Sequence, residues 1–147
     1  MLAFNFEQTT ATSRQRISAL VFAGITLAAL VFVRLFNPVG SGFYPLCPFH
    51  TLTGLHCPGC GSTRGLHQLL QGNLMAALAM NPLMIAMLPF LAYAFLSYTL
   101  VGIRGRGLPK VFVHPTLIKL LFWTVIAFWI LRNLPFYPFT LLAPHTL

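Results

Sequence analysis

Residues 82–103 read PLMIAMLPFLAYAFLSYTLVGI and contain no charged side chain. Roughly 20 mostly apolar helical residues cross a hydrocarbon core about 30 Å thick, so this stretch has the length and composition of a transmembrane helix. Two further runs, residues 17–36 and residues 115–134, are similarly long and apolar. Because backbone amides in lipid must be satisfied within their own segment, each of the three runs is expected to be helical.

The composition of the whole chain agrees with a membrane protein. Of its 147 residues 57% are hydrophobic and 7% charged, with a mean hydropathy of +0.80, which excludes an ordinary soluble domain. Glu7 is the single acidic residue, so hydrolysis by paired carboxylates is excluded. The nine lysines and arginines lie at the ends of apolar runs rather than in aromatic-rich basic patches, which argues against nucleic acid as a partner and for membrane lipids.

The predicted fold is an all-α integral membrane protein with a single domain, residues 1–147. Residues 1–16 form a cytoplasmic tail, residues 17–36, 82–103 and 115–134 span the membrane, and residues 37–81 form a loop outside it. Arg14 and Arg16 precede the first run as in a signal peptide, but no small-x-small cleavage site follows it. The first run is therefore expected to remain as an uncleaved helix.

Orientation follows from the distribution of lysine and arginine, which concentrate on the cytoplasmic side of membrane proteins. Six cations share the side of the amino terminus in a three-helix topology: Arg14, Arg16, Arg104, Arg106, Lys110 and Lys119. The other side has three: Arg34, Arg64 and Arg132. We expect a multi-pass protein of the inner (plasma) membrane, with its amino terminus in the cytoplasm and the loop and carboxyl terminus outside. Arg132, at a helix end, is expected to extend to the lipid headgroups.

All three cysteines lie in the outer loop. The loop contains a C-x2-H pattern, Cys47-Pro48-Phe49-His50, and a C-x2-C pattern, Cys57-Pro58-Gly59-Cys60. Few other polar side chains are available for chemistry in this chain. This loop is therefore the candidate functional site.

Short helices are expected after the cysteines. Leu66, Leu69 and Leu70 recur at helical spacing and Gly72 is a suitable stop, which predicts an amphipathic helix on the membrane surface. Residues 74–80 can form a second short helix before Asn81-Pro82, a cap and first-turn proline. A re-entrant pair of helices is the alternative. Gly61, Gly72, Asn81 and Pro82 are assigned structural roles at these helix ends.

A longer pattern links these segments. Cys47-Pro48 is followed by Thr53-Gly54-Leu55-x-Cys57-Pro58-Gly59-Cys60-Gly61-x-Thr63-Arg64, then by Gly72-Asn73 and Asn81-Pro82. The pattern resembles that of a bacterial membrane-protein family known as domain of unknown function twenty-seven fifty-two, over roughly residues 45–95. The resemblance implies a small multi-helix membrane protein and no established activity.

A metal site is one hypothesis for the loop. Cys-Pro-x-Cys-Gly is similar to the turn that holds the metal in zinc ribbons and rubredoxins, and Cys47, His50, Cys57 and Cys60 would complete a Cys3His zinc site. His56 or His67 could replace His50.

Thiol redox chemistry is the second hypothesis. A C-x2-C pair at a helix start, near Arg64, can have a lowered thiol pKa. Membrane thiol oxidoreductases usually need two cysteine pairs, and this chain has three cysteines.

The third hypothesis is structural: a disulfide or a packed turn pins the loop, and Thr63 and Arg64 contact a lipid headgroup or a partner. On balance the sequence indicates a non-enzymatic membrane protein whose loop is structural, metal-binding or partner-binding, with a membrane partner protein. A membrane thiol-disulfide or metal-dependent redox component is the alternative.

Overall fold

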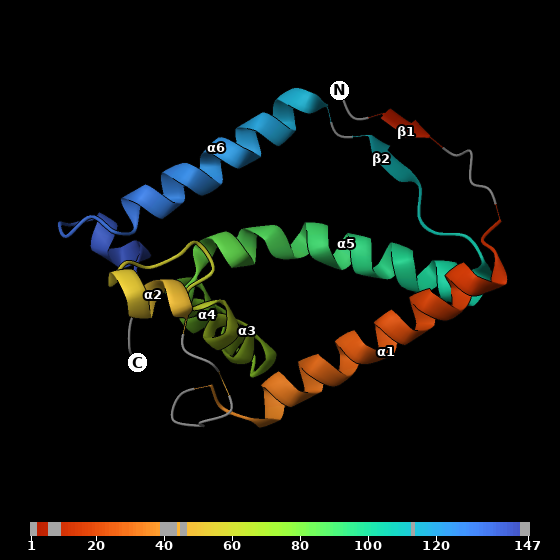
Figure 1. Ribbon diagram of the computed structural model, residues 1–147, viewed down its shortest axis with the longest axis horizontal. Helices are drawn as coiled ribbons and strands as arrows, with labels where there is room; N and C mark the ends of the chain where they lie inside the picture. The colour runs from red at the N-terminus through yellow and green to blue at the C-terminus, as the bar shows by residue number, and fades with distance from the viewer. Residues whose placement is uncertain (1–2, 6–9, 39–43, 45–46, 113, 145–147) are drawn as a thin grey trace. The chain divides into compact units, whose positions relative to one another are not determined.

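The computed structural model describes the chain except residues 1–2, 6–9, 39–43, 45–46, 113 and 145–147. Six α-helices make up most of the described residues (Figure 1), in agreement with the predicted all-α class. The three long helices are α1 (Ser13–Leu35), α5 (Pro82–Arg104) and α6 (Pro115–Leu131). The short ones are α2 (Pro48–Thr53), α3 (Ser62–Leu70) and α4 (Leu74–Met80), and a 3-10 turn, η1, covers Phe139–Leu142.

Two features of the fold, a pair of short strands and a short helix, depart from the sequence prediction. β1 (Ala3–Asn5) pairs antiparallel with β2 (Lys110–Phe112), with Phe4 opposite Val111, so part of the predicted amino-terminal tail is a strand. The cysteine-containing loop includes a helix that was not predicted, α2, with Pro48 in its first turn. A six-residue helix is too short to leave a periodic signal in the sequence.

α1 and α5 are long and apolar enough to cross a membrane. Their large apolar side chains lie on the surface, as in Ile25 at 66% exposure and Phe90 at 71%. Exposed apolar surface of this extent along whole helices indicates a membrane protein. α6 has 17 residues and is shorter than the predicted run 115–134.

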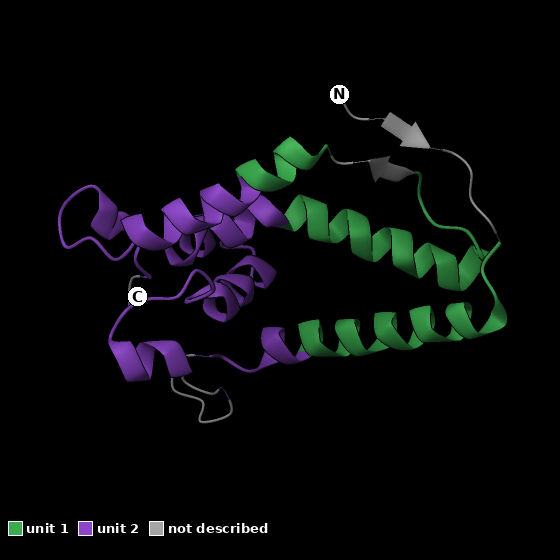
Figure 2. Cartoon of the chain, turned by 45° about the horizontal axis from the view of Figure 1, so that its top comes forward, with its two compact units in different colours: residues 1–31, 88–120 green, residues 32–87, 121–147 purple. Residues whose placement is uncertain are grey.

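The chain divides into two compact units (Figure 2). The first unit consists of residues 1–31 and 88–120, and the second of residues 32–87 and 121–147. In the first unit the Arg16 guanidinium donates to the carbonyls of Gly102 and Ile103, over 3.2 and 3.1 Å, at the end of α5. Gly102 permits close packing here, because a Cβ on it would lie 2.8 Å from Leu20 Cγ.

All three cysteines belong to the second unit, in which α3 packs on α4. Ala77 and Met80 of α4 are buried, and Gly65 of α3 allows the two helices to approach. A Cβ on Gly65 would lie 3.2 Å from the Ala77 carbonyl oxygen. Gly61, directly before α3, also lies close to the end of α4, because a Cβ on it would lie 2.5 Å from the Met80 carbonyl oxygen.

Candidate metal centre

The turn that we call the cysteine turn, residues 57–61, has a defined backbone. The Cys60 amide donates to the Cys57 carbonyl and the Ser62 amide to the Gly59 carbonyl, each over 3.0 Å. The Cys57 amide also points at the Cys60 sulphur, 3.3 Å away. Gly61 closes the turn with φ of +84°, a conformation that other residues adopt at a cost. The turn therefore directs an amide toward a sulphur, as a metal-binding turn requires.

Cys47 comes from a separate segment and is held by α2. It occupies the N-cap position of that helix, and its carbonyl accepts from the Thr51 amide over 3.0 Å. Gly54, with φ of +73°, ends α2, and its amide donates to the His50 carbonyl over 2.9 Å. These contacts position the Cys47 side chain without help from a side-chain cap.

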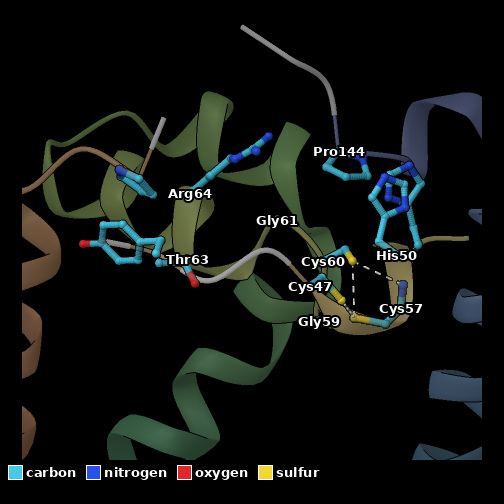
Figure 3. A pocket seen from close by; sticks show the side chains of 12 residues that line it. Cys47, His50, Cys57, Gly59, Cys60, Gly61, Thr63, Arg64 and Pro144 are labelled. Atoms are coloured by element: carbon cyan, nitrogen blue, oxygen red, sulfur yellow. Dashed lines mark hydrogen bonds between the residues drawn. The ribbon is translucent and has the colours of Figure 1, made fainter. Parts of the chain in front are cut away.

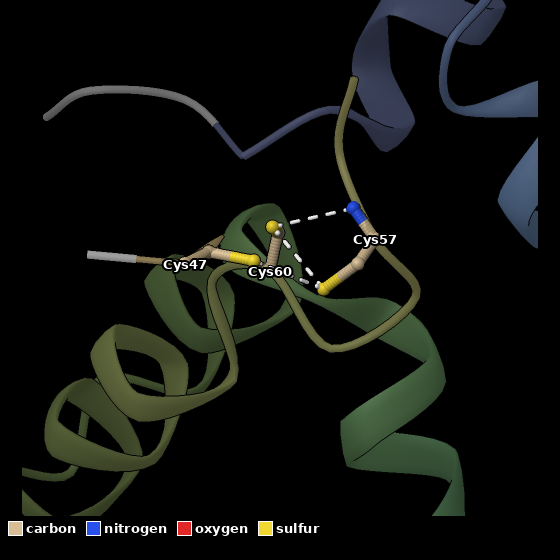
Figure 4. Close-up of side chains that lie close together, drawn as sticks. All are labelled: Cys47, Cys57 and Cys60. Atoms are coloured by element: carbon tan, nitrogen blue, oxygen red, sulfur yellow. Dashed lines mark hydrogen bonds between the residues drawn. The ribbon is translucent and has the colours of Figure 1, made fainter. Parts of the chain in front are cut away.

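The three sulphur atoms converge (Figure 4), and we call Cys47, Cys57 and Cys60 the thiol cluster. Sγ of Cys57 lies 3.6 Å from Sγ of Cys47 and 3.3 Å from Sγ of Cys60, and all three lie within 4.8 Å of one another. A disulfide bond measures about 2.05 Å, so the three cysteines are free thiols. Three sulphurs at these separations could bind one metal ion.

The thiols differ in their acidity. A hydrogen bond from the backbone of His50 lowers the pKa of Cys47. Burial, reinforced by a hydrogen bond with the Cys57 side chain, raises the pKa of Cys60 to about 12. Cys60 is thus a protonated thiol at neutral pH in the metal-free protein, and a cation would have to displace its proton.

The thiol cluster opens onto a pocket of about 390 Å³ (Figure 3). Its lining, apart from the cysteines, comprises Pro38, Tyr44, His50, His56, Gly59, Gly61, Thr63, Arg64 and Pro144. The lining thus includes one guanidinium, two imidazoles and two hydroxyl groups in addition to the sulphurs. A small ligand or a fourth metal ligand could enter from this side.

Two of the three candidate histidines line the pocket. His50 and His56 stack, with ring centroids 4.5 Å apart and an angle of 12° between the rings. His50 Nδ1 lies 3.3 Å from the Leu55 carbonyl, and burial is the main cause that lowers the pKa of His56. Neither ring belongs to the group of ligand atoms within 4.8 Å that the sulphurs form. The predicted Cys3His set is thus brought together only in part.

His67 has a different setting. It is buried on α3, and its Nδ1 lies 2.7 Å from the carbonyl of Val33 near the end of α1. It does not line the pocket. The structure therefore gives His67 a packing contact where the sequence offered it as a ligand.

Asn81 holds the cysteine turn through hydrogen bonds of its side chain. Its amide nitrogen donates to the carbonyls of Pro58, over 2.9 Å, and Cys60, over 3.3 Å, and to the Ser62 hydroxyl over 2.9 Å. Its Oδ1 accepts from the Met84 amide in the first turn of α5, directly after Pro82. The side chain thus joins the first turn of α5 to the cysteine turn, and only the helix cap was expected.

Arg132 is buried, contrary to its predicted position at the membrane surface. We expected it to extend to lipid headgroups, but it is buried, with 1% of its surface exposed. Its guanidinium donates to the carbonyls of Cys57, Pro58 and Cys60 over 3.0, 3.1 and 3.1 Å. An arginine directly after an apolar run indicates only where the run ends. No pattern in the sequence predicts that its side chain contacts residue 57.

Asn133, beside Arg132, fixes the residue before the cysteine turn. Its side chain accepts from the His56 amide over 2.7 Å and donates to the His56 carbonyl over 2.9 Å. These two bonds hold the backbone of His56 directly before the cysteine turn. No motif or spacing in the sequence pairs residue 133 with residue 56.

The remaining candidates lie at the edges of the site. Thr63 and Arg64, in the first turn of α3, line the pocket further from the cysteines (Figure 3). Gly72 has φ of +89° just after α3, where its amide donates to the Leu69 carbonyl over 2.9 Å. Ser62 begins α3 behind Gly61, which occupies the N-cap position without a side-chain hydrogen bond.

Residues 47–95 match a family described as "Protein of unknown function (DUF2752)". The match confirms the family resemblance and includes the thiol cluster, α2, α3, α4 and residues 82–95 of α5. No curated protein and no solved structure matches the chain.

Proposed function

We propose that this chain, a DUF2752 protein over residues 47–95, is a membrane protein that binds a soft metal ion through Cys47, Cys57 and Cys60. The observation that carries the proposal is the convergence of three sulphurs from two separate segments within 4.8 Å. A packing role alone would not require the sulphur atoms of three cysteines to converge on one point. Zinc is the preferred ion, because it takes thiolate and imidazole ligands in a tetrahedral arrangement.

The fourth ligand would come from the pocket. His50 and His56 are the nearest candidates, since both line it, and a small movement of α2 or of residue 56 would be needed to bring an imidazole to the metal. Otherwise a water or a small ligand takes the fourth position, as in zinc sites that keep one position open. The proposed protein is a metal-binding component rather than an enzyme.

We place this site outside the plasma membrane. α1 and α5 span it, and α6, at about 1.5 Å per residue, has a length of about 25 Å and makes the third crossing. The six-to-three distribution of cations supports a cytoplasmic amino terminus with the thiol cluster and carboxyl terminus outside. Lipids surround the helices, and a membrane protein that exchanges the metal is the expected partner.

A second candidate function is thiol-disulfide exchange, which the unequal thiols favour. The Cys47 thiolate would attack a partner disulfide, and Cys57, 3.6 Å away, would then attack the mixed disulfide. The Cys47–Cys57 disulfide forms as the partner disulfide is reduced to two thiols, with two electrons and two protons transferred. Cys60 has no role in this exchange, whereas the metal site requires it.

Elemental mass spectrometry of the purified full-length chain tests the proposal. We expect one zinc per chain, lost in Cys60→Ser and on treatment with a chelator. His114→Gln is the matched control, because His114 contacts Thr116 in the other unit and should leave the zinc content unchanged. Protein without zinc, combined with mixed disulfides trapped by Cys57→Ser, would favour thiol exchange instead.

A further inference from the structure

The buried guanidinium of Arg132 is the least explained charge in the described part of the chain. It is 1% exposed, and its Nε has no hydrogen-bond partner. The chain's only acidic residue, Glu7, and its carboxyl terminus lie outside the described residues, so no carboxylate faces Arg132 among those that the structure describes. Burying a charge without a counter-charge is costly, typically by several kcal/mol.

The hydrogen bonds of Arg132 do not by themselves explain the charge. Neutral Asn81 donates to two of the same carbonyls, those of Pro58 and Cys60. The ring of Phe128, 4.9 Å from the guanidinium carbon, adds a cation-π contact of modest strength. A neutral side-chain amide could therefore hold the cysteine turn, so these hydrogen bonds do not explain why residue 132 carries a positive charge.

The thiol cluster next to Arg132 offers an explanation for the buried charge. Arg132 donates to the backbone of Cys57 and Cys60, two of the three residues that supply sulphurs. A divalent ion bound by three thiolates and a neutral fourth ligand leaves one net negative charge on the site. Such a complex would be the counter-charge that Arg132 lacks.

We propose that Arg132 is the charge-balancing residue of the occupied site: its buried guanidinium compensates the single negative charge of a divalent ion held by Cys47, Cys57 and Cys60. The inference rests on the proposed metal-binding function and adds a role for a residue of α6's end, outside the segment that matches the family. Arg132 does not bind the metal. It stabilises the thiolate complex through its charge and the cysteine turn through its hydrogen bonds.

The experiment measures Zn²⁺ affinity of the full-length chain in detergent by competition with a chromophoric chelator at one pH. Arg132→Gln keeps a hydrogen-bond donor and removes the charge, so we expect Zn²⁺ binding about ten- to a hundredfold weaker. Arg132→Lys keeps the charge without the planar fork and should retain most of the affinity. Arg34→Gln, in the same unit on α1, is the matched control for lost charge and should bind as the parent does.

Thermal unfolding of the metal-free variants gives the second measurement. If the charge is balanced only when metal is bound, Arg132→Gln should lose less stability without metal than with it. Equal weakening of Zn²⁺ binding in Arg132→Lys and Arg132→Gln would overturn the proposal in favour of a purely structural role. So would parental affinity in Arg132→Gln, or a loss of stability in Arg132→Gln that is as large without metal as with it, because the charge would then be needed before metal binds.

The two proposals fail in different ways. Parent protein that binds no Zn²⁺ refutes the metal-binding function itself. Parent protein that binds Zn²⁺, with Arg132 variants that show one of the contrary results above, refutes only the charge-balancing role.

Discussion

The guanidinium of Arg132 donates to the carbonyl of Cys57 over 3.0 Å and so joins the end of α6 to the cysteine turn, 75 residues earlier in the chain. Asn133 makes the neighbouring connection, to His56. The candidate metal centre is therefore built from three parts of the chain: α2, the cysteine turn and the end of α6. Substitutions that act on these supports should be separable from those that remove a ligand.

Asn81→Ala should destabilise the protein without removing a ligand. The substitution leaves the Met84 amide without its acceptor and removes the hydrogen bond to the Ser62 hydroxyl, whereas the Pro58 and Cys60 carbonyls keep Arg132 as a donor. A buried polar group that loses its partner costs about 1–3 kcal/mol. We expect the free energy of unfolding to fall by about 2–4 kcal/mol. Thermal unfolding followed by circular dichroism measures it, and a variant as stable as the parent would show that Asn81 does not support the turn.

Gly61→Ala should be more harmful than Gly54→Ala, although both glycines have positive φ. A Cβ on Gly61 would lie 2.5 Å from the Met80 carbonyl oxygen, whereas a Cβ on Gly54 would meet nothing within 4 Å. We expect a cost of about 1 kcal/mol at Gly54 from its conformation alone and about 2–4 kcal/mol at Gly61. Equal costs in the same unfolding assay would contradict the close approach of the cysteine turn to α4.

The histidines can be tested as ligands by comparison. If one of the stacked rings completes the coordination, His50→Gln or His56→Gln should weaken Zn²⁺ binding at least tenfold, while His67→Gln should not. His67→Gln will instead lower stability, because its imidazole contacts the Val33 carbonyl in a buried position. Unchanged binding in both pocket variants would leave the fourth position to water or a small ligand.

The Cys60 thiol predicts a pH dependence of the reduced, metal-free protein. Its pKa is raised from 9.0 to about 12, mainly by burial, so the folded state holds the proton more tightly than the unfolded chain does. The resulting stability is fully present below pH 9 and is lost as the pH rises from 9 toward 12. Unfolding measured across this range should show the decline in the parent and a smaller one in Cys60→Ala. A parent with flat stability would refute the burial of this thiol.

The sequence predicts what is local and periodic. The helices 62–70 and 74–80, the long apolar runs and the position of the cysteines follow from spacing and composition, and the structure has helices there. α2 escaped prediction because six residues give no periodic signal. The setting of Arg132 was not predicted, because a cation after an apolar run normally faces lipid headgroups. Only the folded chain shows that the partners of Arg132 are carbonyls of the cysteine turn.

Co²⁺ titration of the reduced full-length chain tests the metal-binding account most directly, because sulphur-to-cobalt charge-transfer absorption grows with the number of bound thiolates. A site with three cysteine ligands should saturate at one Co²⁺ per chain with the intensity of three thiolates, reduced by about a third in Cys47→Ser, Cys57→Ser or Cys60→Ser if each variant still binds. A parent spectrum without charge-transfer absorption, or one that a single cysteine substitution leaves unchanged, would contradict it.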